Sequence, residues 1–248
     1  MREGPDLEYS DYREHYRLDG EIFHFEEETE SPHREANRRL GQQMLGLARL
    51  KEDERILDVG CGSGWLLAAL SRSGVKQLYG IDLSRAQYFK GSRDRLPGGV
   101  FLEGDAYFLP FGDKSMDAVI MSEILEHLER PDVAIKDAAR VLKPGGRLLV
   151  TVPAREKIRY TLCIHCNRKT PVSAHLHAFD IPGLKALLEQ AGLDFSVGIN
   201  LLNKALVAAR VHLLLRMLPY SAWRVIDKTA GLFLDRWTNI CTRADKSL

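Results

Sequence analysis

A glycine-rich turn, followed about 20 residues later by an acid, has the residue types and spacing of a nucleoside-binding site. The turn reads Asp58-Val59-Gly60-Cys61-Gly62-Ser63-Gly64 and follows a short apolar run. Glycines let the backbone turn tightly and approach a ligand closely, and the start of the helix expected after the turn offers free N–H groups. Asp82 ends the next apolar run, where a carboxylate can accept hydrogen bonds from both hydroxyls of a ribose.

The acid that begins the turn argues against a dinucleotide. The carboxylate of Asp58 would repel a pyrophosphate, but it would attract a ligand that carries a cationic sulfonium and an amino group. The turn and Asp82 together therefore favour an adenosyl group attached to a positive centre over a nicotinamide dinucleotide.

A second segment carries the side chains of acid–base chemistry and reads Met121-Ser122-Glu123-Ile124-Leu125-Glu126-His127-Leu128. On a helix, Glu123 and His127 would be i and i+4 and would share one face, with Glu126 to the side. Because an imidazole ordinarily titrates near neutral pH, His127 is the candidate general base, with Glu123 beside it. The alternative is that His127 only forms a hydrogen bond with Glu123 and fixes the loop.

Two cysteines and two histidines further along the chain have the spacing of a zinc site. Cys163 and Cys166 form a C-x2-C pair on one tight turn, and His175 and His177 follow closely enough to complete a tetrahedron. We therefore predict a structural zinc ion. Two alternatives stay open: reduced thiols with surface histidines, or histidines that line the acceptor pocket under a lid.

Short apolar runs that alternate with helical patterns position these residues. Strands are expected at Arg55–Val59, Gln77–Asp82, Val100–Glu103, Asp117–Met121, Arg147–Val152 and Leu193–Val197. Helices are expected from Ser31 to near Leu50, over Trp65–Leu70, from Ser84 through Lys90, from Val133 to Leu142 and over Pro182–Ala191. This alternation implies right-handed βαβ units, a mostly parallel sheet and an α/β fold.

Read in order, six segments resemble a class I S-adenosylmethionine-dependent methyltransferase, in the type 11, ubiquinone-menaquinone group of small-molecule enzymes. The segments are Ile56–Gly64, Gly80–Ser84, Glu103–Ala106, Leu109–Phe111, Met116–Val119 and Arg140–Gly146. The resemblance implies a Rossmann-like sandwich, a seven-stranded, mostly parallel sheet with helices on both faces. Thr238–Arg243 would be the antiparallel seventh strand, and apolar helices at Leu201–Leu218 and Ala222–Leu234 would be an insertion at the substrate-side edge.

The same resemblance implies S-adenosylmethionine as the cofactor and a set of residues that contact it. They are Asp58, Gly60 and Gly62 at the methionine part, Asp82 at the ribose, Leu83, Asp105 and Ala106 at the adenine, and Ser122 at the end of the fourth strand.

The segment from Glu123 to His127 also bears on the methyl acceptor. Glu-x-x-Glu-His in this position resembles small-molecule methyltransferases, including quinone and other phenol O-methyltransferases, some of which hold a divalent cation with this cluster. The segment is not Asn/Asp-Pro-Pro-aromatic and lacks Pro-Cys, which argues against amino methylation of adenine or glutamine and against cytosine C5 chemistry. We predict O-methylation of a small, apolar or lipid-like acceptor. The alternatives are a protein or RNA acceptor, favoured by a basic stretch at 155–216, or a binding protein without turnover.

Composition limits the partners and the compartment. The chain has 248 residues, with 35 Lys and Arg against 34 Asp and Glu, so it is not built to neutralise DNA phosphates. Four cysteines do not make a disulfide framework, which indicates a reducing, cytoplasmic location. The most apolar run, 205–218, is interrupted by charged residues, so no membrane span is expected; peripheral membrane contact and a homodimer remain options.

We divide the chain into four parts on these patterns. The parts are an N-terminal arm and helix at 1–40, a cofactor-binding core at 41–155, a Cys/His segment at 156–180, and the end of the sheet with its inserted helices at 181–248.

Overall fold

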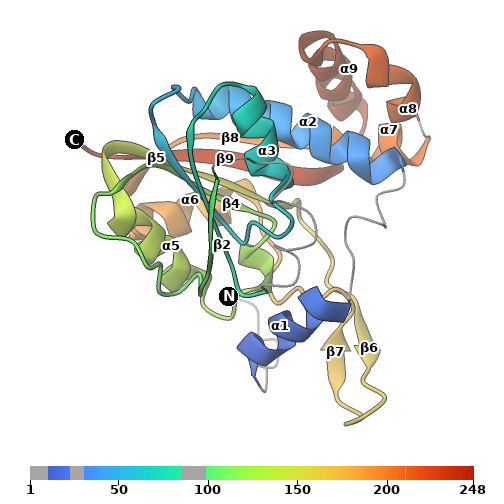
Figure 1. Cartoon of the computed structure of the whole chain (residues 1–248). Helices are drawn as coiled ribbons and strands as arrows, with labels where there is room; N and C mark the ends of the chain where they lie inside the picture. Colours follow the sequence, from blue (N-terminus) through green and yellow to red (C-terminus); the bar gives the residue numbers. More distant parts are fainter. Residues whose placement is uncertain (1–10, 23–30, 85–98, 210) are drawn as a thin grey trace.

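The computed structural model describes residues 11–22, 31–84, 99–209 and 211–248, and it contains a seven-stranded sheet between two layers of helices (Figure 1). The strands of this sheet are β1 (Arg55–Val59), β2 (Gln77–Asp82), β3 (Val100–Glu103), β4 (Met116–Ser122), β5 (Leu142–Pro153), β8 (Leu193–Asn203) and β9 (Trp237–Lys246). The predicted α/β sandwich is therefore confirmed, including the antiparallel last strand.

The sheet order brings the strand ends with polar residues to one edge. The order is β3-β2-β1-β4-β5-β9-β8, in which β1 to β5 are parallel and β9 runs antiparallel to both β5 and β8. The order reverses between β1 and β4, which is the topological switch point where parallel sheets open a crevice beyond their carboxyl ends. The ends of β1, β2 and β4 all point into this region.

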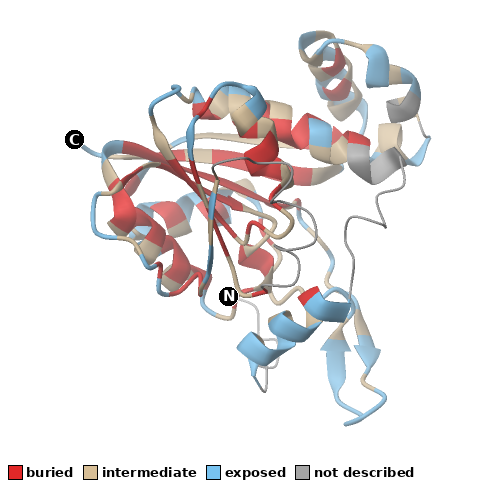
Figure 2. Ribbon diagram, viewed as in Figure 1, coloured by how far each residue is buried: buried red, intermediate tan, exposed pale blue. Residues whose placement is uncertain are grey.

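The central strands are buried on both faces, as their continuous apolar runs require. Ile56 and Leu57 of β1 are both 0% exposed and, being consecutive in a strand, point to opposite faces. Ile56 packs with Leu40 and Leu67 from helices on one side, and Leu57 packs with Ile135 on the other. Figure 2 shows this buried layer along the sheet and the inner sides of the helices.

The helices confirm most of the predicted boundaries. They are α1 (Tyr12–Ile22), α2 (Ser31–Ala48), α3 (Trp65–Arg72), η1 (Leu125–His127), α5 (Pro131–Val141), α6 (Ile181–Gln190), α7 (Lys204–Ala208), α8 (Val211–Leu214), η2 (Leu215–Met217) and α9 (Tyr220–Phe233). The helix predicted from Ser84 through Lys90 lies outside the described residues.

The insertion between β8 and β9 differs from the prediction in its first half. One long helix was expected from Leu201 to Leu218, but Leu201 pairs with Asn239 and β8 continues to Asn203. The side chain of Asn203 then accepts the N–H of Ala205 at 3.0 Å, which starts the short helix α7. The apolar pattern was therefore strand first and helix only afterwards.

A buried acid anchors the second half of the insertion to the sheet. Asp227 of α9 is 0% exposed and accepts the backbone N–H groups of Leu202 and Asn203 at 3.2 and 2.7 Å. Arg224 balances its charge at 2.9 Å. Because β8 runs parallel to β5, this insertion leaves the sheet at the edge where β1, β2 and β4 end.

The segment after β5 forms a small hairpin outside the main sheet. Its strands are β6 (Tyr160–Leu162) and β7 (Lys169–Pro171), and they project from the body beside α1 (Figure 1).

Candidate active site at the carboxyl edge of the sheet

The glycine turn after β1 has the conformation that its sequence requires. Gly60, Gly62 and Gly64 have φ angles of 73°, 47° and 74°, a region that L side chains rarely adopt. The Gly60 N–H donates to Ile81 at 2.8 Å, and the Gly62 N–H donates to the carboxylate of Asp82 at 2.8 Å. The turn is thus held directly against the end of β2.

Substituting Ala at Gly60 should destabilise the protein. A Cβ there would lie 2.6 Å from Cδ1 of Ile124, in addition to the strain of φ +73°. We expect a loss of about 2–4 kcal/mol, which lowers Tm by roughly 5–10 °C in a thermal melt. Gly112→Ala is the matched control, because nothing lies within 4 Å of its Cβ position. Equal melting temperatures for the two variants would contradict the packing described here.

Two acids at the ends of β1 and β2 create a site that attracts positive charge. Burial, with the nearby Asp82 as a second cause, raises the pKa of Asp58 to about 8. Burial also raises the pKa of Asp82, while the N–H groups of Ser84 and Gly62 lower it. A cation beside the pair would stabilise the two ionised carboxylates and so lower both pKa values. Leu83 follows Asp82 directly, where its backbone also contributes to the lowering.

Helix α1 covers the end of β3. Asp105 accepts hydrogen bonds from the Tyr12 hydroxyl at 2.6 Å and from Arg13 at 3.0 Å, and its other oxygen accepts the Tyr107 N–H at 3.0 Å. Ala106 next to it is 6% exposed and belongs to the core. The residue expected at the adenine is therefore bound to the N-terminal helix in this structure.

The segment after β4 is not a helix on which Glu123 and His127 could share a face. Glu123 has a φ of 53°, and only the short turn η1 follows it, so Glu123 and His127 do not share a helical face. The local reason is the close connection to the sheet: the Glu123 N–H donates to Thr151 at 2.9 Å, and one of its carboxylate oxygens accepts from Asn239 at 3.0 Å. Ser122 is within 2.9 Å of the Thr151 hydroxyl.

His127 is partly buried and neutral at physiological pH. Burial lowers its pKa to about 4, and the nearby His175 contributes to the same direction. The ring is hydrogen-bonded to the backbone of Ala174, and its Nδ1 atom is buried without a partner in the described structure. Tyr16 of α1 contacts the ring edge-on, with centroids 6.0 Å apart.

Other buried polar atoms near His127 are unpartnered as well. Within the described part of the chain they are Oε1 of Glu123, Oε2 of Glu126 and Nε2 of His177. Burial raises the pKa of Glu123 and of Glu126. Buried polar groups in folded proteins are nearly always satisfied by protein, ordered water or ligand, so these atoms are the points at which a bound molecule could add hydrogen bonds.

The four residues predicted to hold zinc are not brought together. Cys163 and Cys166 lie at the tip of the β6–β7 hairpin, whereas the backbone N–H groups of Leu176 and His177 donate to the carbonyl of Glu126. That contact fixes the histidine segment beside η1. Among the described residues, the set with metal-ligand proximity is instead Glu126, His127 and His175, whose ligand atoms lie within 4.8 Å of one another.

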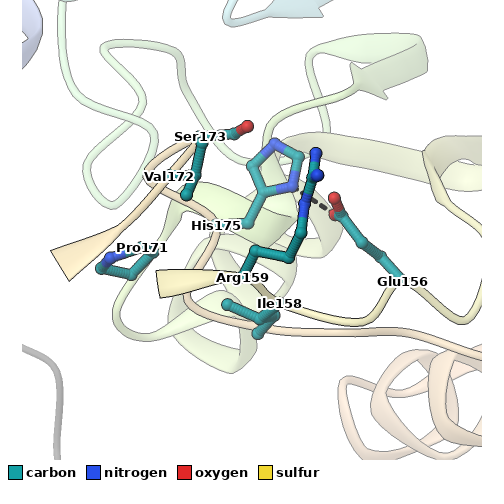
Figure 3. Close-up of a pocket in the computed structure, with 7 residues that line it drawn as sticks. All are labelled: Glu156, Ile158, Arg159, Pro171, Val172, Ser173 and His175. Atoms are coloured by element: carbon teal, nitrogen blue, oxygen red, sulfur yellow. Dashed lines mark hydrogen bonds and ion pairs between the residues drawn. The ribbon is translucent and has the colours of Figure 1, made fainter. Parts of the chain in front are cut away.

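His175 joins this set through a pairing that the sequence did not reveal. Its Nδ1 atom contacts the carboxylate of Glu156, and its ring lies 4.7 Å from that of His127 between centroids. Figure 3 shows the His175–Glu156 pair in a small pocket, with Arg159 beside it. Of the predicted metal residues, then, only His175 reaches the catalytic candidates by a side-chain contact.

Sequence reasoning missed the residues that reach the site from distant segments. Asn239 comes from β9 and holds Glu123, and no local motif distinguishes it from other strand residues. Tyr12 and Tyr16 come from α1; their i, i+4 spacing was a detectable signal, because it places both rings on one face of a helix.

The geometry agrees with comparisons against known proteins. Residues 57–150 match a methyltransferase domain. The chain is 42% identical to the fatty-acid O-methyltransferase of Mycolicibacterium smegmatis over 102 aligned residues. The aligned region covers 40% of this chain and 37% of that protein. It is also 31% identical to the methyltransferase GfsG of Streptomyces halstedii over 170 aligned residues. This aligned region covers 66% of this chain and 61% of that protein. The chain therefore spans less than two thirds of either relative.

A comparison with solved structures supports the fold alone. The structure of a 4+2 cyclase, SpnF, superimposes with a TM-score of 0.62 at 23% identity, covering 85% of this chain and 80% of that one. Because a protein named as a cyclase has this fold, the fold alone does not define the reaction. The domain match, the relatives and the sheet order agree, and we conclude that residues 57–150 form a methyltransferase domain within a Rossmann-like methyltransferase fold.

Proposed function

We propose that the protein transfers a methyl group from S-adenosylmethionine to a hydroxyl or other oxygen of a small-molecule acceptor. The observation that carries this proposal is the imidazole of His127, whose lowered pKa keeps it neutral at pH 7 and whose Nδ1 atom is buried without a partner in the described structure. Ile124, three residues before His127, forms the contact with Gly60 that connects the two sites.

The residues at the switch point suit the expected cofactor. The glycine turn lies at the carboxyl end of β1, where the N–H of Gly62 donates to the carboxylate of Asp82. Asp58 and Asp82 are a buried acid pair whose raised pKa values favour a cationic neighbour. These features support binding of the sulfonium and amino group near Asp58 and of the ribose near Asp82.

The chemistry required of the protein is modest. When bound, S-adenosylmethionine would supply a methyl group attached to a positively charged sulfur. The acceptor oxygen would bond to the methyl carbon as the carbon–sulfur bond on its opposite side breaks. In the proposed step, His127 accepts the acceptor's hydroxyl proton at Nδ1, and Glu123 stays fixed by Asn239. Because the site is buried and η1 is tied to its neighbours, alignment of the acceptor contributes most of the rate.

A divalent cation is the second role that the same cluster supports. Glu126, His127 and His175 have the nitrogen and oxygen donors that such an ion uses, and His127 could not then act as a base. Dialysis against a chelator separates the two roles: turnover that survives supports the base, and turnover that is lost and restored by Mg²⁺ or Zn²⁺ supports the cation.

The cover over the site favours a small acceptor. Helix α1 contacts Asp105 and His127, so a protein or RNA acceptor would have to displace it. The fatty-acid and menaquinone enzymes among the relatives act on small molecules by name, which supports an apolar acceptor. We also propose a cytoplasmic location, supported by four cysteines that the structure leaves unpaired.

Transfer of a radiolabelled methyl group tests the proposal. The protein is incubated with labelled S-adenosylmethionine and, separately, with fatty acids, phenols, reduced quinones, bulk RNA and bulk protein. We expect label in a small-molecule fraction. Label in RNA or protein would replace the proposed acceptor class, and cofactor binding without transfer to any acceptor would favour a non-catalytic binding protein.

Proton release on cofactor binding tests the role of Asp58. Since its pKa is about 8, the acid is mainly protonated at pH 7 in the free protein. A bound cation lowers that pKa, so binding should release up to about one proton and tighten as the pH rises from 6 to 8. Calorimetry in two buffers with different heats of ionisation measures the release. Asp58→Asn should release none, and release equal to that of the parent protein would contradict this assignment.

A further inference from the structure

The insertion between β8 and β9 carries large apolar side chains on its surface. Leu214 and Met217 are 80% and 84% exposed, and Val225, Leu232 and Phe233 of α9 are 65%, 80% and 86% exposed. In Figure 1, α8 and α9 lie together at one side of the sheet, and Trp223 of α9 packs in the same core cluster as Leu40 and Met44 of α2. Exposed apolar side chains that gather in one element of a folded protein mark an interaction surface.

The apolar residues of α9 lie on one face of that helix. Trp223 and Asp227, which are four residues apart, are buried and anchor the helix. Val225, Leu232 and Phe233 follow the spacing i, i+7 and i+8, so they lie together on the side that faces away from the anchor. An outward helix face of a folded protein is usually polar, whereas this one combines the exposed Ser221, Lys228 and Thr229 with these three large apolar side chains.

The insertion carries an excess of positive charge, which suits an anionic partner. Residues 204–236 contain six Lys or Arg, two Asp and no Glu, whereas the whole chain has a net charge of only +1. Lys204, Arg216, Lys228 and Arg236 are exposed, and none of them has an ion pair with another described residue. The two acids of this segment already have partners: Asp227 is buried and forms an ion pair with Arg224, and Asp235 bonds to Arg155 and to the Trp237 indole N–H.

We propose that the insertion docks on an anionic lipid surface, with the outward face of α9 immersed among the acyl chains and the four exposed cations at the phosphate level. Apolar residues interleaved with basic ones are the features of an interfacial helix. None of the described helices is long and apolar enough to cross a bilayer, so the contact is peripheral. A second copy of this chain fits less well, because two such insertions would bring like charges together.

The docking surface and the candidate site lie at the same edge of the sheet. The insertion starts where β8 ends, and β8 pairs there with the part of β9 that adjoins the end of β5. The insertion and the candidate site therefore both begin at this edge. The proposal goes beyond methyl transfer and does not depend on it, because docking requires neither cofactor nor acceptor.

Sedimentation with vesicles tests the proposal without any turnover. The full-length protein is mixed with vesicles of phosphatidylcholine alone or with phosphatidylglycerol added at about a third of the lipid. We expect binding to the anionic vesicles only, weakened by added salt because the attraction is partly electrostatic. Absence of binding to both vesicles would overturn the proposal.

Two variants locate the contact. Leu232→Ser/Phe233→Ser should reduce vesicle affinity by about ten-fold or more, and Lys228→Gln/Arg236→Gln by about ten-fold or more. Both alter exposed side chains, so circular dichroism should show an unchanged fold. The matched controls are Ile164→Ser, which is 90% exposed at the tip of the β6–β7 hairpin, and Lys136→Gln on α5. Controls that weaken binding equally would overturn the proposal, as would a dimer in light scattering that the Leu232/Phe233 variant dissociates.

Discussion

Replacing Asp82 by Ala should weaken S-adenosylmethionine binding by about 100- to 10,000-fold. The carboxylate holds the glycine turn through the Gly62 N–H and is the expected acceptor for the ribose hydroxyls. Loss of two hydrogen bonds to a charged group, at roughly 1.5–3 kcal/mol each, gives an effect of this size. Titration calorimetry with the purified protein measures it directly.

The control for this variant is an acid that lies at the other end of the sheet. Asp53→Ala removes an exposed carboxylate in the turn before β1 and should leave the affinity unchanged. If Asp82→Ala bound the cofactor as tightly as Asp53→Ala, the proposed cofactor site would be wrong, whatever the fold of the domain.

Replacing His127 by Ala should lower kcat by about 100- to 10,000-fold, which is the usual contribution of general acid–base catalysis. Cofactor affinity should stay the same, because the described contacts of His127 are with Tyr16, Ala174 and His175 and not with the glycine turn. The measurement is steady-state turnover with the best acceptor from the labelling experiment. His165→Ala, an exposed histidine in the hairpin, is the control.

A conservative variant and a pH profile distinguish a base from a merely structural histidine. Gln at position 127 can keep a hydrogen bond to Ala174 but cannot accept the proton, so turnover should remain low. Because burial lowers the pKa of His127 to about 4, the imidazole is neutral above that pH. The rate should therefore show no His127 step between pH 6 and 7 and should fall only as the pH approaches 4. Full rescue by His127→Gln would leave His127 with a positioning role only.

The cofactor half of the site could be predicted because its chemistry depends on local backbone. A turn that needs positive φ angles must carry glycines, and Gly60, Gly62 and Gly64 stand where the structure has those angles. Asp82 follows a buried strand whose limits were predicted from a short apolar run. Both features depend only on residues that are close together in the sequence, so a short segment is enough to predict them.

The acceptor half could not be predicted to the same degree. The spacing of Glu123 and His127 would place both side chains on one face only in a helix, but hydrogen bonds to Thr151 and Asn239 hold Glu123 in a left-handed conformation. Likewise, Cys163 and Cys166 suggested a metal site with the two histidines, but the backbone of Glu126 draws the histidine segment away to η1. Tertiary hydrogen bonds outweighed the local pattern in both cases.

The amino-acid sequence by itself determined the alternation of strands and helices, the glycine turn, the acids at the ends of β1 and β2, and hence the methyltransferase domain. Those features follow from backbone sterics and from burial of apolar runs, which act over a few residues. Only the tertiary structure decided which distant side chains meet: Tyr12 with Asp105, Asn239 with Glu123, and His175 with His127. The physical reason is that such contacts depend on the order and register of the strands, and a side chain's own sequence neighbours do not encode its partner across the sheet.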